Sequence, residues 1–191
     1  MRMLVRALWA AVVLALLLKL FHLPLASLLL ILWASALAML YWALGWLLFP
    51  TPTRKHQLIG LSILAGFAFA ALITGALFRI QVWHGADTQL MIGLVLGGAT
   101  ITLAMAFRRK RPDLNAYFNG VLWRVLPLLI VAALLYPVTP VAMMRFHHRG
   151  ESEAKINLLE QLHSSLDEGE RSRVLHELDS LDQAEVDARL K

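Results

Sequence analysis

Two cationic side chains lie at positions where the sequence predicts a membrane surface. Lys19 and Arg79 each close a long apolar run of the sequence, so both are expected near one face of a bilayer. Together they can form a cationic ring that attracts anions or lipid headgroups. The simpler interpretation is that each long side chain extends to the interface and has no ligand, as cations at the ends of membrane helices commonly do. We favour the simpler interpretation and keep both residues as candidates.

The turns that follow these two cations carry the other candidates. One imidazole lies in each turn, His22 in the first and His84 in the second. If the turns pack in register, the two imidazoles can meet as a metal pair or as a pH-sensitive latch. Histidines in turns often have no such role, and we favour that alternative because the two positions do not align. The candidate functional residues are Lys19, His22, Arg79, Trp83, His84 and Asp87.

Several kinds of site are excluded by what the sequence lacks. It has no cysteine, which removes disulfides, thiolate metal sites and iron–sulfur clusters. It also has no nucleophile motif, phosphate-binding glycine loop or carboxylate pair, and its histidines do not face each other within apolar runs as haem ligands would. We therefore expect no enzymatic activity, no catalytic residue, no cofactor and no metal site.

The elements that position the candidates are apolar helices. Hydrophobic residues make up 59% of the 191 residues and charged residues 16%, and the mean hydropathy is +0.63. About a quarter of the residues of a soluble domain are charged, so the bilayer is the main solvent of this chain. The sequence predicts an all-α, polytopic helical membrane protein with two tandem transmembrane hairpins and a fifth helix that contains proline. The predicted helices are residues 4–21, 25–49, 58–78, 89–107 and 121–144.

Two of these runs allow more than one interpretation. The first has basic residues before it and small residues after it, as a cleaved signal peptide does, but a further apolar run follows it instead of a soluble domain. The fifth contains Pro127, Pro137 and Pro140, so it should be kinked or broken. It either crosses the bilayer or forms a re-entrant or interfacial segment. This choice decides on which side of the membrane the C-terminal tail lies.

Charge is divided unevenly along the chain. Residues 1–150 hold 13 Lys and Arg against only Asp87 and Asp113, a net charge of +11, whereas residues 151–191 hold 11 acids against five basic residues. The basic residues of the first part lie in short loops, where they set topology, so we exclude nucleic acid as a partner. Their distribution predicts a multi-pass protein of the inner (plasma) membrane with a cytoplasmic N-terminus.

The C-terminal part has a different character. We predict a transmembrane domain over residues 1–149 and a soluble, acidic helical tail over residues 150–191. Two amphipathic helices are expected in the tail, on either side of a break near Gly169. A pair this short buries little core alone, so we expect it to pack on the membrane domain, on its own copy or on another protein. Its apolar stripes are Ile156, Leu159, Leu162 and Leu166, then Leu175, Leu178 and Leu181.

The two hairpins resemble each other when the sequence is shifted by 60 residues. Residues 19–27 then align with residues 79–87. Each segment has a cation at the end of a run, then an aromatic residue and an imidazole, then a small residue before the next run. This pattern indicates a duplicated hairpin whose two copies are parallel in the membrane, because two helices separate them.

The second turn and its flanks resemble a known family. Residues 74–87 read TGALFRIQVWHGAD, and residues 91–94 read MIGL. This pattern resembles the transmembrane hairpin of the GldL family of gliding-motility and type IX secretion proteins of Bacteroidota, over about residues 66–107. The family is understood as a component of a proton-driven motor whose hairpin carries a buried acid. No Asp or Glu occurs in the five apolar runs, so the resemblance implies the hairpin fold without that mechanism.

We therefore predict a non-enzymatic integral subunit or accessory protein of an inner-membrane, cell-envelope assembly. Its expected partners are the lipid bilayer and either its own copies, as a homo-oligomer, or other membrane proteins. Small residues support this, because they give the second hairpin a surface suited to close helix packing. The glycines of that surface are Gly60, Gly66, Gly75, Gly93, Gly97 and Gly98.

The alternative is a small transporter or channel. Five helices and an internal repeat would suit such a function. The runs contain few polar side chains that could line a pore, which counts against it. These side chains are Ser62, Thr74, Thr100 and Thr102.

Overall fold

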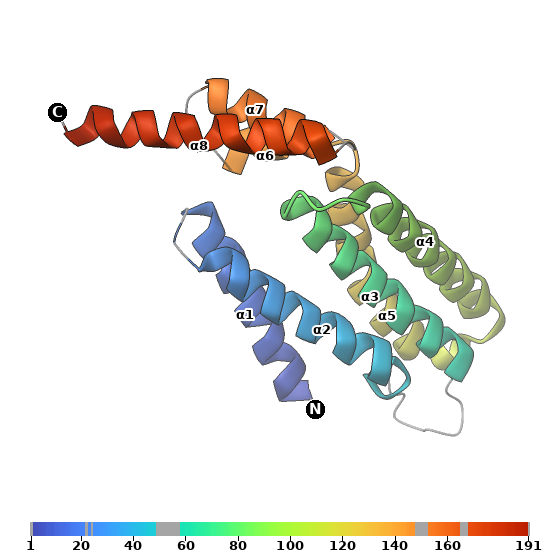
Figure 1. The fold of residues 1–191 in the computed structure, drawn as a ribbon. Coiled ribbons are helices and arrows are strands. Elements are labelled where there is room, and N and C mark those ends of the chain that lie inside the picture. Colours follow the sequence, from blue (N-terminus) through green and yellow to red (C-terminus); the bar gives the residue numbers. More distant parts are fainter. Residues whose placement is uncertain are drawn as a thin grey trace. The chain divides into compact units, whose positions relative to one another are not determined.

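The computed structural model describes residues 2–21, 23, 25–48, 58–147, 153–164 and 168–190. It divides into two compact units, residues 1–138 and residues 139–191. Helices and short turns make up the described part of the first unit (Figure 1). Its elements are α1 (Arg2–Leu20), α2 (Ala26–Leu48), α3 (Ile59–Ile80), α4 (Ala86–Lys110), the 3-10 helix η2 (Pro112–Leu114) and α5 (Asn115–Leu135).

Five segments of the described chain are long and apolar enough to cross a membrane, namely α1 to α4 and the segment that contains α5. The protein is therefore a polytopic helical membrane protein, as the composition predicted. α5 has 21 residues, or about 32 Å of helix, which matches the ~30 Å hydrocarbon core of a bilayer. Its length is that of a full crossing.

The fifth predicted helix is divided in the structure. Instead of one helix over residues 121–144, α5 ends at Leu135 and a separate helix, α6 (Pro140–His147), follows it. Pro137 has no N–H to donate and its ring would clash in a continued helix, whereas Pro140 suits the first position of α6. Pro127 lies inside α5, which continues through it. The break expected from the prolines thus lies after Leu135.

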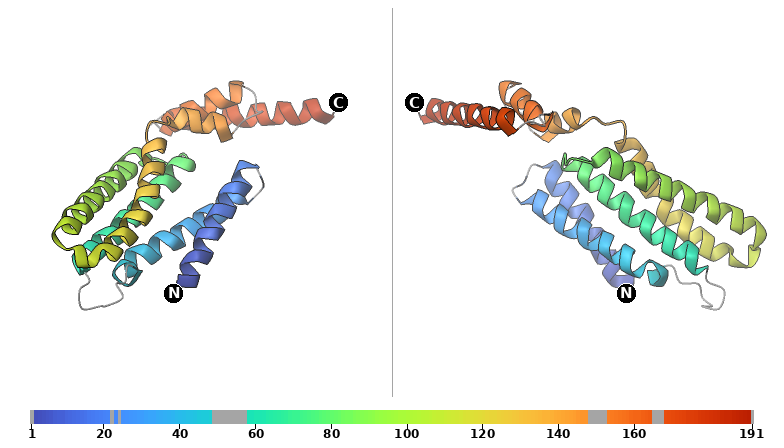
Figure 2. Two further views of the ribbon diagram at one scale, coloured as in Figure 1. Left: turned by 180° about the vertical axis from the view of Figure 1, so that it is seen from behind. Right: turned by 45° about the vertical axis from the view of Figure 1, so that its right-hand side comes forward.

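α3 is the central helix of the first unit. It packs against α2, α4 and α5, and it is the most buried of the five candidate spans. Both views in Figure 2 show α3 between the first hairpin and the pair α4 and α5. Phe69 of α3 is buried and stacks on Tyr41 of α2 with 4.4 Å between ring centroids. Large apolar side chains on the outer faces of α1, α4 and α5 are exposed, as expected for helices that contact lipid.

α2 and α3 approach each other closely at two glycines. A Cβ on Gly45 would lie 2.7 Å from the Cα of Gly66, and a Cβ on Gly66 would lie 2.7 Å from the carbonyl oxygen of Tyr41. Both distances are far below a normal van der Waals contact, so only glycine allows the two backbones to lie this close. Gly45 was not predicted, because it stands alone in a run of large apolar residues.

The predicted small-residue surface is confirmed in part. A Cβ on Gly75 or on Gly93 would meet backbone atoms across the contact between α3 and α4 at 3.0 Å, and one on Gly97 would meet the side chain of Leu129 at 2.6 Å. These glycines therefore lie at helix contacts within the chain. Gly60 and Gly98 have no neighbour within 4 Å of such a Cβ.

The two hairpins repeat one backbone pattern at an offset of 60 residues. The first helix of each hairpin ends, and the second begins, at equivalent positions. Leu25 and Gly85, which are equivalent, both have positive φ, at 68° and 80°. The backbone hydrogen bonds of the two turns also follow the repeat that was inferred from the sequence. The equivalent bonds are Phe21 N to Leu17 O and Gln81 N to Leu77 O, Leu23 N to Leu18 O and Trp83 N to Phe78 O, and Leu29 N to Leu25 O and Gln89 N to Gly85 O.

The second unit consists of α6, α7 (Glu153–Ser164) and α8 (Glu168–Leu190) in its described part. α7 and α8 pack through a small core of Leu158, Val174 and Leu178, and Lys155 Nζ donates to Asp182 Oδ1 at 2.6 Å. Two helices separated near Gly169 were predicted here. Partly buried residues around the core are Leu159, Leu162 and Leu181.

The predicted apolar stripes of the tail differ from the structure at two positions. Leu175 is 52% exposed instead of packed, and Val174 beside it takes the buried position. Leu158, which was not in the first stripe, is buried as well. Leu166 lies outside the described residues. Leu178 and Leu181 keep their predicted places, so the described apolar face of α8 differs from the predicted one at Val174 in place of Leu175.

The close contact of α2 and α3 can be tested with a single methyl group. Gly66→Ala should lower the free energy of unfolding by about 1–3 kcal/mol, because the new Cβ meets backbone atoms and the two helices must separate. The measurement is the midpoint of thermal unfolding of the full-length protein in detergent. Gly98→Ala is the matched control and should keep or raise the midpoint, since its Cβ has open space and alanine favours helix. Equal midpoints for the two variants would contradict the contact.

Candidate functional site

Arg79 lies in the last turn of α3, and it is only 2% exposed. Its Nη2 donates to Oδ1 of Asp87, in the first turn of α4. The same Nη2 donates to the carbonyl oxygen of Tyr136 at 3.1 Å, just after α5. Arg79 therefore connects the end of α3 with the start of α4 and with the residue after α5, and protein acceptors hold its guanidinium.

The ion pair of Arg79 and Asp87 fits the electrostatics of the two helices. A cation in the last turn of one helix and an anion in the first turn of the next both interact favourably with the helix dipoles. The Asp87 side chain is 69% exposed, so water screens the carboxylate, whereas the guanidinium is buried. Arg79 Nε and Nη1 have no hydrogen-bond partner among the described residues. Removal of Asp87 would therefore leave a buried charge with one carbonyl oxygen as its acceptor, which is unfavourable.

Lys19 contacts the second hairpin. Its Nζ donates to Oε1 of Gln81 at 2.6 Å and to the carbonyl oxygen of Ile80 at 3.4 Å. Gln81 Nε2 in turn donates to the carbonyl oxygen of Ser27 at 3.1 Å. The side-chain amide of Gln81 thus contacts the first hairpin on both sides of the turn between α1 and α2. Protein acceptors hold Lys19, as they hold Arg79, so the two cations are used inside the protein and not as an open ring.

The internal repeat explains why Gln81 has this position. Lys19 is equivalent to Arg79, and Ser27 is equivalent to Asp87. The first hairpin therefore has a cation but lacks the carboxylate that would pair with it. Gln81 supplies the missing acceptor from the second hairpin. We call the resulting group the turn cluster, which consists of Lys19, Ser27, Arg79, Gln81, Asp87 and Tyr136.

The turn between α3 and α4 has a local geometry that places the turn cluster. Trp83 N donates to Phe78 O at 2.9 Å and Val82 N donates to Arg79 O at 3.2 Å, which is the Schellman pattern of a helix C-terminus. The hydrophobic contact that often accompanies this pattern is present, because the rings of Phe78 and Trp83 lie edge to face at 5.1 Å. Trp83 is therefore a packing residue of the turn. Val82 takes the left-handed position, with φ of 57°, where glycine is usual.

The candidate histidines are not part of the turn cluster as described. His84 is exposed in the turn between α3 and α4. His22 lies outside the described residues, so a pair of His22 and His84 stays a prediction.

The hydroxyl groups of the spanning helices form hydrogen bonds within the protein. Ser62 Oγ and Tyr117 Oη lie 2.6 Å apart and form a buried bond between α3 and α5. Thr74, Thr100 and Thr102 each donate to the carbonyl oxygen four residues earlier, at 2.8–2.9 Å. Hydrogen bonds within the protein thus satisfy hydroxyl groups that lie in apolar helices.

Three members of the turn cluster were not predicted. Ser27 and Tyr136 act through backbone carbonyl groups, which every residue type has, so the sequence gives no signal for them. Gln81 could be recognised only by comparing the two hairpins, because it takes the place of the carboxylate that the first hairpin lacks. The described turn cluster contains a guanidinium, an ammonium, an amide and one carboxylate that is already paired. Such a set can fix helix ends, but it does not supply an activated nucleophile.

The comparison with known families identifies the second hairpin. Residues 64–121 match the GldL N-terminal domain. The match covers most of α3, the turn, all of α4 and η2, and the start of α5. It confirms the resemblance seen over residues 66–107 and extends it through the basic end of α4 to residue 121. Neither the curated proteins nor the solved structures contain a match to the chain.

The left-handed conformation of Val82 leads to a prediction for the turn. Val82→Gly should raise the free energy of unfolding by about 0.5–1 kcal/mol, because a β-branched residue is strained at positive φ and glycine is not. Val95→Gly, an exposed position inside α4, is the matched control and should lower it by about 0.5 kcal/mol. Denaturant unfolding of the full-length protein in detergent measures both changes. A loss of stability in both variants would mean that the turn is not strained.

Proposed function

We propose that the protein is a non-enzymatic inner-membrane subunit or accessory protein of a cell-envelope assembly of the gliding-motility or type IX secretion kind. The observation that carries the proposal is the match of residues 64–121 to the GldL N-terminal domain. The matched segment contains both residues of the ion pair, Arg79 and Asp87. It also contains most of α3, the central helix of the membrane unit. The matched segment therefore lies at the centre of the packing of this unit.

The role that the residues support within such an assembly is that of a scaffold. A proton-driven motor needs an ionisable group inside the bilayer. The acids of residues 1–138 are Asp87 and Asp113, and both lie at helix ends. We therefore assign the proton-carrying group of any motor to another subunit. This chain would supply a closely packed set of helices on which that subunit assembles.

The proposed orientation follows from the basic residues. Arg108, Arg109 and Lys110 end α4, and Arg2 and Arg6 lie at the start of α1. Figure 1 shows the N-terminus and the end of α4 at the end of the unit opposite to the two hairpin turns. Positive residues remain preferentially in the cytoplasm, so we place this end there and the turn cluster on the opposite side.

Deletion of the gene in its native host tests the proposal. Gliding and the export of type IX secretion substrates should be lost or strongly reduced, because the assembly lacks a scaffold. A plasmid copy of the wild type should restore both. Purification of the tagged full-length protein in mild detergent should in addition recover a stoichiometric membrane partner.

Two results together would overturn this function. One is normal gliding and secretion in the deletion strain, and the other is a purified protein that contains only copies of itself. In that case a small transporter or channel would be the better assignment, and solute flux into liposomes that contain the pure protein would be the measurement to make.

A further inference from the structure

A groove of about 470 Å³ lies at the surface of the first unit, between the start of α3 and the end of α4. Residues 58–61 and Leu64 line it from the α3 side, and Leu103 and Phe107 line it from α4. Of the described residues that line the groove, none is charged, and Leu103 is 40% and Phe107 37% exposed. Side chains exposed on membrane-spanning helices contact lipid, so the groove opens toward the acyl chains of the bilayer.

The groove exists because Gly60 has no side chain. A Cβ on Gly60 would meet no atom within 4 Å, and Leu64, four residues later, lies on the same face of α3. Unlike Gly66 and Gly75, Gly60 makes no close backbone contact that requires glycine, and glycine is less favourable than alanine within a helix. The packing of the described unit gives no reason for a glycine at this position, whereas an occupant of the groove would.

A basic segment begins directly where the groove ends. Residues 108–111 read RRKR, end α4 and are all exposed. α4 has 25 residues, or about 38 Å of helix, which exceeds the ~30 Å hydrocarbon core of a bilayer, so its last turn extends to the lipid headgroups. The ion pairs between described residues have Arg79 and Lys155 as their cations, and neither belongs to this segment. Four cations against one acid, Asp113, leave residues 108–113 with a net charge of +3.

Lys110 continues the face of α4 that lines the groove. Leu103, Phe107 and Lys110 are spaced by four and three residues, so they share one face of the helix. Arg109 lies about 200° around the helix from Phe107, which places it on the opposite face. An anionic group at the end of the groove is therefore close to Lys110 and farther from Arg109.

We propose that this groove binds an anionic phospholipid. An acyl chain lies along Gly60, Leu64 and Leu103, and the phosphate group lies at Lys110. Clusters of Lys and Arg directly beyond a membrane helix attract anionic headgroups in this way. A soluble anion would leave the apolar groove unused, and an apolar partner helix would leave the basic segment without an anion, so a phospholipid fits both parts of the site. This inference does not depend on the proposed function.

The acidic tail of the chain suits the basic segment by charge but not by topology. Residues 151–191 carry 11 acids. α5 begins next to the basic segment and runs for about 32 Å, and Tyr136 then meets Arg79 at the far end of α3. The chain thus leaves the first unit at the end opposite to the basic segment. A lipid of the leaflet around that segment reaches the groove directly.

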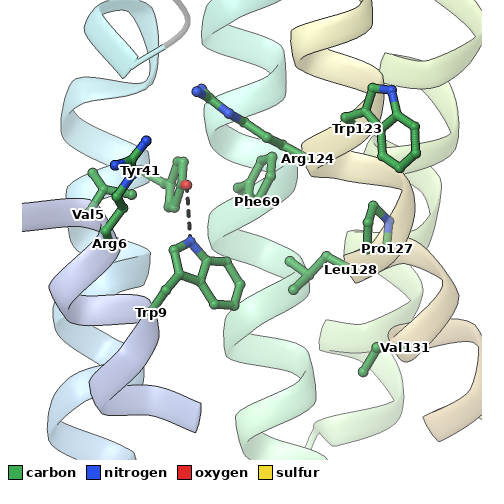
Figure 3. A pocket seen from close by; sticks show the side chains of 10 residues that line it. All are labelled: Val5, Arg6, Trp9, Tyr41, Phe69, Trp123, Arg124, Pro127, Leu128 and Val131. Carbon is green, nitrogen blue, oxygen red and sulfur yellow. Dashed lines mark hydrogen bonds between the residues drawn. The ribbon is translucent and has the colours of Figure 1, made fainter. Parts of the chain in front are cut away.

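A second cavity of the first unit is less suitable for an anionic lipid. It has a volume of about 500 Å³ and lies between α1, α2, α3 and α5 (Figure 3). Aromatic side chains line it, and Trp9 Nε1 donates to Tyr41 Oη at 3.3 Å (Figure 3). The cation that α5 brings to this cavity, Arg124, already has an interaction partner within the protein. An anion in this cavity would have to compete with that partner.

Lipid retention by the full-length protein tests the site. The purified protein is mixed in mild detergent with equal amounts of phosphatidylglycerol, which is anionic, and phosphatidylethanolamine, which is zwitterionic, and the bound lipid is counted by native mass spectrometry. The wild type should retain phosphatidylglycerol in preference. Lys110→Gln should weaken that preference about fivefold, the effect of one cation near an anionic headgroup.

A matched change one residue away controls for the loss of positive charge. Arg109→Gln removes the same charge from the opposite face of the same helical turn, so it should weaken the preference by less than about twofold. Equal loss in Arg109→Gln and Lys110→Gln would overturn the site in favour of a general surface charge effect. Equal retention of the two lipids by the wild type would also overturn it.

A change in shape without a change in charge tests the apolar part. Gly60→Leu should fill the groove and abolish preferential retention, while the thermal midpoint stays at or above that of the wild type, since the Cβ has open space and leucine favours helix. Gly98→Leu is the matched control, because Gly98 is equally open and does not line the groove, and it should retain phosphatidylglycerol like the wild type. Unchanged retention by Gly60→Leu would place the lipid elsewhere and overturn the proposal.

Two further measurements separate the other sites and occupants. Val131→Trp, which narrows the second cavity, should leave the retention of phosphatidylglycerol unchanged, and its loss would place the lipid in that cavity instead. Glycerol phosphate, the soluble headgroup alone, should not compete with the lipid. Full competition by glycerol phosphate would overturn the proposal in favour of a soluble-anion site.

Discussion

The buried guanidinium of Arg79 is the constraint on which the rest of the membrane unit depends. A charge buried within the protein must be compensated by groups that the protein itself brings to it. Asp87 of α4 and the carbonyl oxygen of Tyr136 after α5 both do so, and they can reach Arg79 only if the three helices end together. The same end of α3 also carries Gln81, through which Lys19 and the first hairpin are attached. The C-terminal end of α3 therefore organises the hairpin turns of the whole unit.

Packing along the helices complements this polar arrangement. The α2 and α3 backbones meet at Gly45 and Gly66, and the α3 and α4 backbones meet at Gly75 and Gly93. Lipid gives helices no hydrophobic reason to associate, so close backbone contact and internal hydrogen bonds must provide the stability. The segment that matches the GldL N-terminal domain contains α4 and most of α3, so the match falls on the helix against which α2, α4 and α5 pack.

Much of the fold follows from residue type and spacing alone. Five apolar runs predicted five spanning helices, and a shift of 60 residues revealed a duplication that the turn hydrogen bonds repeat. The break after Leu135 was expected from the prolines, although not its position. The roles of Arg79 and Lys19 could not be predicted in this way, because three of their acceptors come from residues 57, 61 and 62 positions away and two of these three are backbone carbonyl groups.

The most direct test of this account is a double-mutant cycle on Arg79 and Asp87. Unfolding free energies are measured in detergent for the wild type, Arg79→Met, Asp87→Asn and the double variant. We predict a coupling energy of about 1–3 kcal/mol, with Asp87→Asn less harmful once the buried charge is gone. Single effects that add to within about 0.3–0.5 kcal/mol would show that the two side chains act independently, and would contradict the central role given to this ion pair.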